Sequence, residues 1–488
     1  MKVLNTLLSL ACDKDYGPDR ETVTMGLRAL LRLAGTDAAN ASPVLADYLI
    51  SLIDEKISAQ VNTILHHPGF MALESAWRGL LFLTERIDFR QNIRLEYINV
   101  AKDDLLRDFQ DAPEVVQSGF YRHIYTEEFG QFGGVPIAAV IADYTLAPSP
   151  QDIQLLQYAA SVASMAHAPF FAAADKSFFG LEEWRGLPDI NDLPSVFDAP
   201  RFARWNSFRE SPTARYVGLT LPGFLLRLPY GEEGSPTTAS FNFTEETDNE
   251  DAFCWGNTAF ALAAGLAESF AKYRWCVNII GPDGGGRVEN LPCCRHEAMR
   301  GIQDKIPTRA IITEHREFEL ADLGFIPLAI GKTPHETVFF SANSVLKPKT
   351  FPKTPEGISA EISFRLSTQF PYMMLMNRLA HYIKVLQREN MGAWREKNEL
   401  IRELNKWISR YVTEMDTPDA LTRSRRPLRM ARIDVREIDN KAGWYAVTIL
   451  ARPHFKYMGV NFTLSLEGRL ERPMPDDRGI PSSRTLES

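Results

Sequence analysis

The chain has 488 residues, which at roughly 150 residues per domain allows about three domains. Hydrophobic residues make up 45% and charged residues 24%, which is ordinary for a globular protein and excludes a wholly disordered chain. The formal net charge of −8 argues against nucleic acid as the main partner, because phosphate binding needs a positive surface. No apolar run approaches the roughly 20 residues that cross a bilayer, so we expect no membrane protein.

Cysteine usage favours a reducing compartment. The cysteines number five, which is odd and sparse, and no CxxC pair occurs. A disulfide framework is therefore not expected, and the cytoplasm is the predicted location.

The first twelve residues, MKVLNTLLSLAC, superficially resemble a secretion signal. However, Asn5 and Thr6 interrupt the apolar stretch, and Ser9 stands where a lipoprotein signal has leucine. An amphipathic helix is the better interpretation, and its apolar face comprises Val3, Leu4, Leu7, Leu8 and Ala11. Because so short a helix is marginal alone, we expect it to dock on its own domain or in a groove of a partner.

The rest of the first 85 residues is also predicted to be largely helical. One helix is expected between Gly17-Pro18 and Gly35. Ser42-Pro43 has the residues that open a helix, and Pro68-Gly69 ends it. A further helix is expected to run through Trp77.

The middle of the chain alternates between strand and helix patterns, which predicts an α/β layer. The long connections 180–250 and 281–307 are rich in proline and glycine, which favours functional or interfacial loops. The expected strands are 93–100, 135–146, 169–174, 275–280, 309–313, 325–330 and 337–342. The expected helices are 105–109, 113–129, 152–166 and 261–273.

Towards the C-terminus the pattern predicts helices and then a small sheet. The helices are expected at 359–390, with a kink at Pro371, and at 394–412. Three strands follow, at 431–438, 444–452 and 460–470, with a hairpin turn at 440–443. An exposed edge on so small a sheet favours β-augmentation by another chain. The fold class is thus α/β and α+β, and the predicted divisions are 1–66, 67–357, 358–472 and a disordered tail, 473–488.

No motif points to catalysis, a metal or a cofactor. The glycine-rich loop Gly281–Gly286 lacks the Lys-Ser/Thr of a phosphate-binding loop, so a turn is the better interpretation. Cys293, Cys294 and His296 lack the spacing of a zinc site. Neither HExxH nor GxSxG occurs. We therefore predict no cofactor and no metal, and nothing in these motifs points to a catalytic pair.

Two charge runs can each be interpreted as a solvated surface or as an electrostatic contact between subunits, and the basic run has nucleic-acid binding as a third interpretation. The acidic run comprises Glu245, Glu246, Asp248, Glu250 and Asp251, without the glycine and final glutamate of a calcium-binding hand. The basic run comprises Arg423, Arg425, Arg426, Arg429 and Arg432.

A series of motifs, in order over about residues 3–472, carries a resemblance to a known family. They are His66–Pro68, Leu73–Leu80, Gly130–Gly134, Met165–Phe170, Phe208–Ser211, Arg215–Thr220, Leu225–Tyr230, Trp255–Phe260, Ala271–Cys276, Arg378–Tyr382, Arg425–Arg429 and Arg452–Gly459. With these motifs the chain resembles the large subunit of the type VI secretion contractile sheath, the TssC/VipB family.

The resemblance implies a structural protein, not an enzyme, in the cytoplasm of a Gram-negative bacterium. Members pair with a small sheath subunit and stack with further copies into a helical tube around an inner tube protein, on a baseplate, and the tube contracts. Strands exchanged between protomers fit residues 431–470. The resemblance makes seven residues candidates for inter-subunit contacts, namely Arg423, Arg425, Arg426, Arg429, Val460, Phe462 and Leu464.

The resemblance also makes the N-terminal helix the handle for a hexameric AAA+ unfoldase of the ClpV type. The match over residues 1–35 is loose. Two alternatives remain open at this point. One is the sheath of a related contractile machine, such as a phage tail or tailocin, and the other is an α/β enzyme with a site near 281–307.

Overall fold

The computed structural model describes most of the chain. The described residues are 25–26, 43–131, 133–231, 243–247, 250–293, 295–298, 301–304, 307–331, 336–389, 397–415, 418–437, 445–454 and 464–470. They fall into two compact units, 1–75 with 227–254 and 76–226 with 255–488, and each is treated by itself. None of the described helices combines the length and apolar content that a membrane crossing requires.

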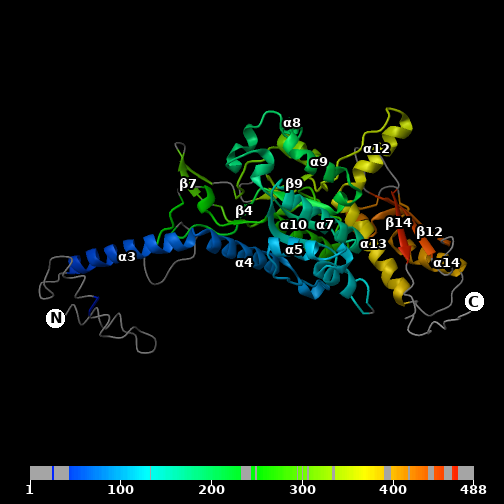
Figure 1. Cartoon of the computed structure of the whole chain (residues 1–488), viewed down its shortest axis with the longest axis horizontal. Helices are drawn as coiled ribbons and strands as arrows, with labels where there is room; N and C mark the ends of the chain where they lie inside the picture. The colour runs from blue at the N-terminus through cyan, green and yellow to red at the C-terminus, as the bar shows by residue number, and fades with distance from the viewer. Residues whose placement is uncertain are drawn as a thin grey trace, which may run out of the picture. The chain divides into compact units, whose positions relative to one another are not determined.

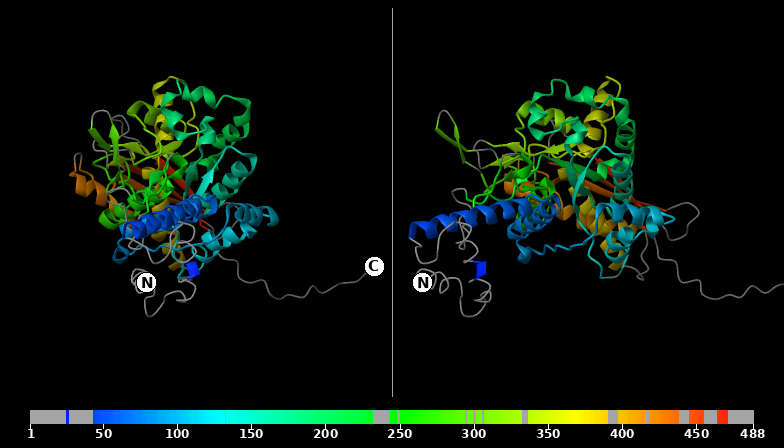
Figure 2. Two further views of the ribbon diagram at one scale, coloured as in Figure 1. Left: turned by 90° about the vertical axis from the view of Figure 1, so that its left-hand side faces the viewer. Right: turned by 60° about the vertical axis from the view of Figure 1, so that its left-hand side comes forward.

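The first unit contains helix α3 (Pro43–Leu65) and the start of helix α4 (Pro68–Arg86). Both begin at a proline, because the ring suits the first turn, where no backbone donor is needed. This start was expected for Pro43, whereas Pro68 was expected only to end the preceding helix and in fact also begins the next. Figure 2 shows α3 as the long blue helix. Of the side chains described in α3, only that of Asn62 is buried. The helices expected before residue 36 lie outside the described residues, apart from 25–26.

A four-stranded parallel sheet forms the centre of the second unit (Figure 1). Its strands, in spatial order, are β1 (Val140–Leu146), β2 (Phe170–Ala174), β3 (Val217–Leu221) and β9 (Phe325–Pro327). Every residue of β3 is buried, as in parallel sheets that are covered on both faces. Helix α7 (Pro150–Ala166) links β1 to β2, and helix α10 (Thr258–Tyr273) packs against the sheet.

The ends of α7 and α10 follow the sequence signals. The Ser149 side chain accepts a hydrogen bond from the Asp152 amide and so caps α7, and the Asn257 side chain caps α10 through the Ala259 amide. The Asn257 amide nitrogen also donates to the carbonyls of Ala142 (3.2 Å) and Tyr144 (3.4 Å) on the edge strand β1. These two carbonyls are therefore not free to pair with another strand.

Three expected strands are absent from the described structure. Residues 93–100 are extended without pairing, and 275–280 and 309–313 form irregular segments. Trp275 and Val277 are buried in the C-terminal core. The apolar pattern of 275–280 thus reflects the burial of individual side chains in a loop. A strand would also need a neighbouring strand with which to pair.

Other boundaries also differ from the predictions. The helix expected over 113–129 is three short pieces, a 3₁₀ turn Val115–Gln117, α6 (Gly119–Tyr121) and a π-helix Arg122–Glu127. The strand expected at 325–330 divides into β9 and β10, which belong to different sheets. The remaining elements of this unit before residue 339 are α5 (Lys102–Asp111), α8 (Leu193–Val196), α9 (Ala203–Glu210), β4 (Phe224–Leu225), β5 (Trp255–Gly256), β6 (Arg287–Val288), β7 (Arg295–Ala298), β8 (Gly301–Asp304), α11 (Glu314–Asp322), β10 (Ala329–Ile330) and β11 (Thr337–Val338).

The C-terminal part of the second unit packs helices on a second sheet (Figure 1). The expected kink at Pro371 is instead a break between two helices, and Pro371 lies in the first turn of the second. The helices are α12 (Pro355–Ser367), α13 (Phe370–Glu389), α14 (Lys397–Ile408) and α15 (Ala420–Arg425). The expected tail lies outside the described residues.

The second sheet is antiparallel, in the order β12 (Leu428–Glu437), β13 (Tyr445–Pro453), β14 (Leu464–Leu470). The predicted pairing of the first two strands is confirmed, whereas the turn at 440–443 lies outside the described residues. Ile433, Val435, Val447 and Ile449 are buried with α13 and α14 in one apolar cluster. The mixed α/β and α+β class is thus as predicted.

Candidate inter-subunit surfaces

The C-terminal sheet has two outer strands, and their edges differ. At β12, Val412 forms a parallel bridge with Leu428, and the Thr413 amide donates to the Leu428 carbonyl. Further along, the Asn405 side chain donates to the Ile433 carbonyl (2.8 Å) and accepts from the Ile433 amide (3.0 Å). The side chain of Asn405 thereby replaces a neighbouring peptide group, and the edge of β12 is occupied at Leu428 and at Ile433.

The other outer strand of the sheet, β14, has an edge that differs from that of β12. β14 pairs with β13 from Tyr445↔Leu470 to Ala451↔Leu464, and no other described strand pairs with it. In an antiparallel ladder, alternate amides and carbonyls of an outer strand point away from its partner. The β14 edge therefore offers backbone groups to a further strand, and this is the place in the described chain where β-augmentation fits best.

The basic run lies next to this sheet. Arg423 and Arg425 are in the last turn of α15, and Arg426 caps it; all three side chains are exposed and pair with none of the described carboxylates. α15 is held by Trp275, whose indole donates to the Arg425 carbonyl (3.1 Å), and by a hydrogen bond between Asn278 and Ser424 (2.9 Å). A fixed short helix thus presents these arginines, whereas Arg429 is half-buried in β12.

The other predicted site residues are placed only in part. Leu464 is the first residue of β14, and its backbone pairs with Ala451. Seven predicted residues lie outside the described residues, namely Val3, Leu4, Leu7, Leu8, Ala11, Val460 and Phe462.

Helix α3 offers a second open surface. Ile50, Ile57 and Ile64 recur every seven residues, and all three are exposed. A seven-residue interval places these side chains along one side of the helix. None of the described residues of its unit buries them.

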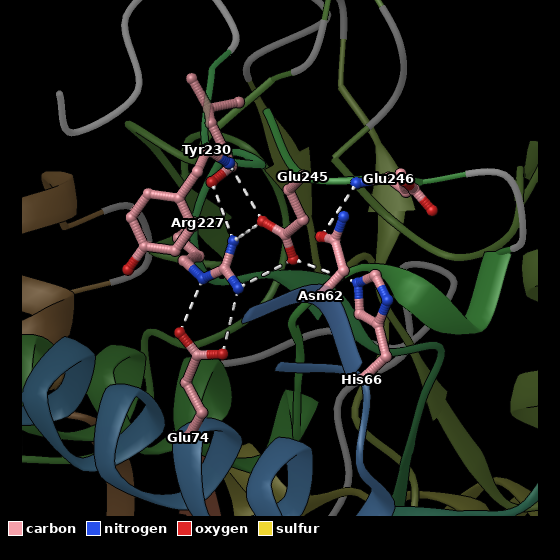
Figure 3. Close-up of polar contacts among 8 residues, drawn as sticks. Asn62, His66, Glu74, Arg227, Tyr230, Glu245 and Glu246 are labelled. Atoms are coloured by element: carbon pink, nitrogen blue, oxygen red, sulfur yellow. Dashed lines mark hydrogen bonds and ion pairs between the residues drawn. The ribbon is translucent and has the colours of Figure 1, made fainter. Parts of the chain in front are cut away.

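The acidic run contains a buried residue, which corrects its interpretation as a purely solvated or inter-subunit surface. The Glu245 side chain is 2% exposed and forms an ion pair with Arg227, whose Nη1 lies 2.5 Å from Glu245 Oε2. Arg227 also donates through Nε to Glu74 Oε1 (2.6 Å) and through Nη2 to Glu74 Oε2 (3.1 Å). Figure 3 shows the guanidinium between the two carboxylates.

The electrostatics of this cluster favour charged partners. Burial alone lowers the pKa of Arg227, but hydrogen bonds to Glu245 and Glu74 outweigh burial, and the net shift is upward. Sequence reasoning missed the cluster, because Glu74 and Arg227 are 153 residues apart. The available signal was a lone arginine in the apolar stretch Phe224–Leu228.

The enzyme alternative concerns the loops around 281–307. The loop Gly281–Gly286 closes as a turn, with the Gly286 amide donating to the Gly281 carbonyl (2.9 Å). An adjoining groove of about 690 Å³ is lined by residues that include Asp283, Glu317 and Phe318. Among the described residues, no cluster of three or more His, Cys, Asp or Glu has the arrangement of a metal site.

Two family models match the chain in tandem. Residues 47–346 match the VipB tail sheath N-terminal domain (EvpB/VC_A0108), and residues 359–470 match the tail sheath gpW/gp25-like domain of the same family. The chain belongs to the VipB family of tail sheath proteins. It is 36% identical over 428 residues to the type VI secretion system sheath protein TssC1 of Pseudomonas aeruginosa. The matched residues are 86% of this chain and 85% of the relative.

Membership of this family makes the chain a structural subunit of the type VI secretion sheath. Between this role and the phage-tail alternative, the relative from Pseudomonas aeruginosa supports the type VI sheath. Among solved structures, a sheath tail protein from Desulfitobacterium hafniense is similar at 9% identity, with a TM-score of 0.31. That match covers 67% of this chain and 57% of the other, and its TM-score is too low to support a conclusion.

Proposed function

We propose that this chain is the large sheath subunit that pairs with a small sheath subunit and polymerises with it. The heterodimers stack in the bacterial cytoplasm around an inner tube protein, on a baseplate, and contraction of the sheath propels the tube. The open edge of β14 is the observation that carries this proposal, because it leaves the C-terminal sheet to be completed by a strand of another subunit. A head-to-tail contact of this kind produces an open helical polymer when its rotation does not close.

The proposal assigns roles to the parts of the chain. Residues 1–66 form an outer helical segment, 67–357 the body and 358–472 the region of inter-subunit contacts. The exposed arginines 423, 425 and 426 support electrostatic contacts to a neighbour, because they have no described acidic partner. Contraction is then a repacking between two arrangements of the lattice, with a small bias in each subunit.

The N-terminal segment is assigned to recycling. The apolar face of Val3, Leu4, Leu7, Leu8 and Ala11 would serve as the handle by which an AAA+ unfoldase of the ClpV type extracts subunits from contracted sheath. We assign the tail 473–488 no role.

Co-expression with the small sheath subunit tests the proposal. The expected result is tubules in negative-stain electron microscopy of the co-purified proteins, with no tubules when this chain is expressed alone. Stable single heterodimers over a wide range of protein concentration would contradict it.

A further inference from the structure

The connection between α3 and α4 is short, and the His67 carbonyl accepts from the amides of Phe70 (2.9 Å) and Met71 (3.0 Å) at its end. α3 ends at Leu65 and α4 begins at Pro68, so only His66 and His67 separate them. Among its described side chains α3 buries only Asn62, which lies in its last turn. The buried contact that holds α3 among the described residues of its unit is therefore near its C-terminal end.

One short segment, residues 245–246, contacts both helices there. On the α3 side, the Glu246 amide donates to Asn62 Oδ1 (3.3 Å), and His66 Nε2 lies 3.4 Å from Glu245 Oε1. On the α4 side, Glu245 reaches Glu74 through the guanidinium of Arg227 (Figure 3). The contacts of α3 and α4 thus converge on Glu245.

The segment itself is also fixed. The Glu245 amide donates to the Tyr230 carbonyl (2.8 Å), and the Tyr230 amide donates to Glu245 Oε2 (3.0 Å). The Arg227 guanidinium carbon also lies 4.5 Å from the centre of the Tyr230 ring, within the range of a cation–π contact. Glu245 is therefore a rigid member of the cluster.

Arg227 is the part of this cluster that no other residue type can replace. Its side chain is 6% exposed, and those of Glu74 and Glu245 are 11% and 2% exposed. Its planar fork contacts two carboxylates at once, whereas a lysine ammonium is a point charge without that geometry. Removal of the guanidinium would leave two buried carboxylates with like charge.

We propose that Arg227 is a positioning residue that fixes the angle between α3 and α4, and with it the direction in which α3 presents its open isoleucine face. The cluster of Glu74, Arg227, Glu245 and His66 links the end of α3 to the start of α4 across the two-residue connection. This role goes beyond sheath assembly, because it applies to the free chain.

The test measures the angle rather than stability. Spin labels on unnatural amino acids at the exposed positions Ser51 in α3 and Leu73 in α4 report the distance between the helices in the free, full-length chain. We expect one narrow distance distribution in the parent and at least a doubling of its width in Arg227→Met. Arg227→Lys should also broaden it, because charge without the fork does not bridge both carboxylates.

Two further variants keep the test decisive. Lys272→Met breaks an exposed ion pair with Glu268 and should leave the distribution unchanged. Glu74→Gln retains the pair between Arg227 and Glu245, and should broaden the distribution at an unchanged melting temperature, even if Arg227→Met fails to fold.

A distribution as narrow as that of the parent in Arg227→Met or in Glu74→Gln would overturn the proposal. So would broadening that appears only with a lower melting temperature of the whole chain, since that would mean a role in overall stability. The measurement needs no partner protein, so its failure is distinct from a failure to form tubules.

Discussion

Two histidines, the half-buried His167 and the buried His381, give the second unit a defined response to acid. His167 caps the C-terminus of α7, and its Nδ1 lies 3.3 Å from the Tyr216 hydroxyl. His381 on α13 contacts the Ala166 carbonyl through Nε2 (2.9 Å). Burial, with a smaller contribution from Lys384, lowers the pKa of His167 to about 4. Burial, with smaller contributions from His167 and Arg378, lowers the pKa of His381 to about 3.

The sign of the effect follows from linkage. Both pKa values lie below the ordinary value of 6.5, so below about pH 6.5 the unfolded chain binds protons that the folded chain does not. The neutral histidines therefore cost no stability above that pH, and the free energy of unfolding falls as the pH drops from 6.5 towards these lowered pKa values.

His381→Gln tests this at the residue scale. Glutamine keeps an amide donor for the Ala166 carbonyl but takes up no proton. We expect the free energy of unfolding to fall less steeply between about pH 6 and about pH 4, by up to about 1.4 kcal/mol per pH unit for the one proton removed. Urea denaturation at several pH values measures this slope, and parallel slopes for variant and parent would contradict the assignment.

At the residue scale, the sequence shows which side chains are charged or apolar, but it does not show which residues they contact. The charge of Glu245 and the apolar surroundings of Arg227 are readable in the sequence, but their contact with Glu74 depends on the fold. The acidic run was therefore assigned as a whole to the surface, although the carboxylate of Glu245 is buried.

At the scale of elements, helices with explicit end signals were predictable. Pro43 was expected at the start of α3 and lies there. The helix expected at 152–166 in fact begins at Pro150, and α4 begins at Pro68, which was expected only to end the helix before it. Strands were less predictable, because the apolar residues of 275–280 are buried without a pairing neighbour. The sequence also did not show which edge of the C-terminal sheet is open, since this depends on where Asn405 of α14 lies.

Removal of one strand tests the open edge. A chain that ends at residue 463 lacks β14, whereas a chain that ends at residue 470 retains it. With the small subunit, we expect tubules only from the longer chain, while both chains keep the parallel sheet and its cooperative thermal unfolding. Electron microscopy and circular dichroism would measure these properties, and tubules from the shorter chain would rule out a necessary role for β14.

At the scale of the whole molecule, the family match spans nearly all of the described structure, at residues 47–346 and 359–470. The two sheets have different edges. In the parallel sheet, the outer strand β1 has two carbonyls, those of Ala142 and Tyr144, that accept from Asn257, whereas the outer edge of β14 pairs with no other described strand. Under the proposed function, a subunit of this kind would be completed by its neighbours, because part of its backbone pairing would lie between chains.

Hydrogen exchange of the β14 amides tests this claim most directly. In the free chain, only the alternate amides of residues 464–470 that pair with β13 should be protected. In tubules with the small subunit, the other amides should slow by about 100-fold or more, because a neighbouring strand then covers them. Tubules in which these amides exchange as fast as in the free chain would contradict the account.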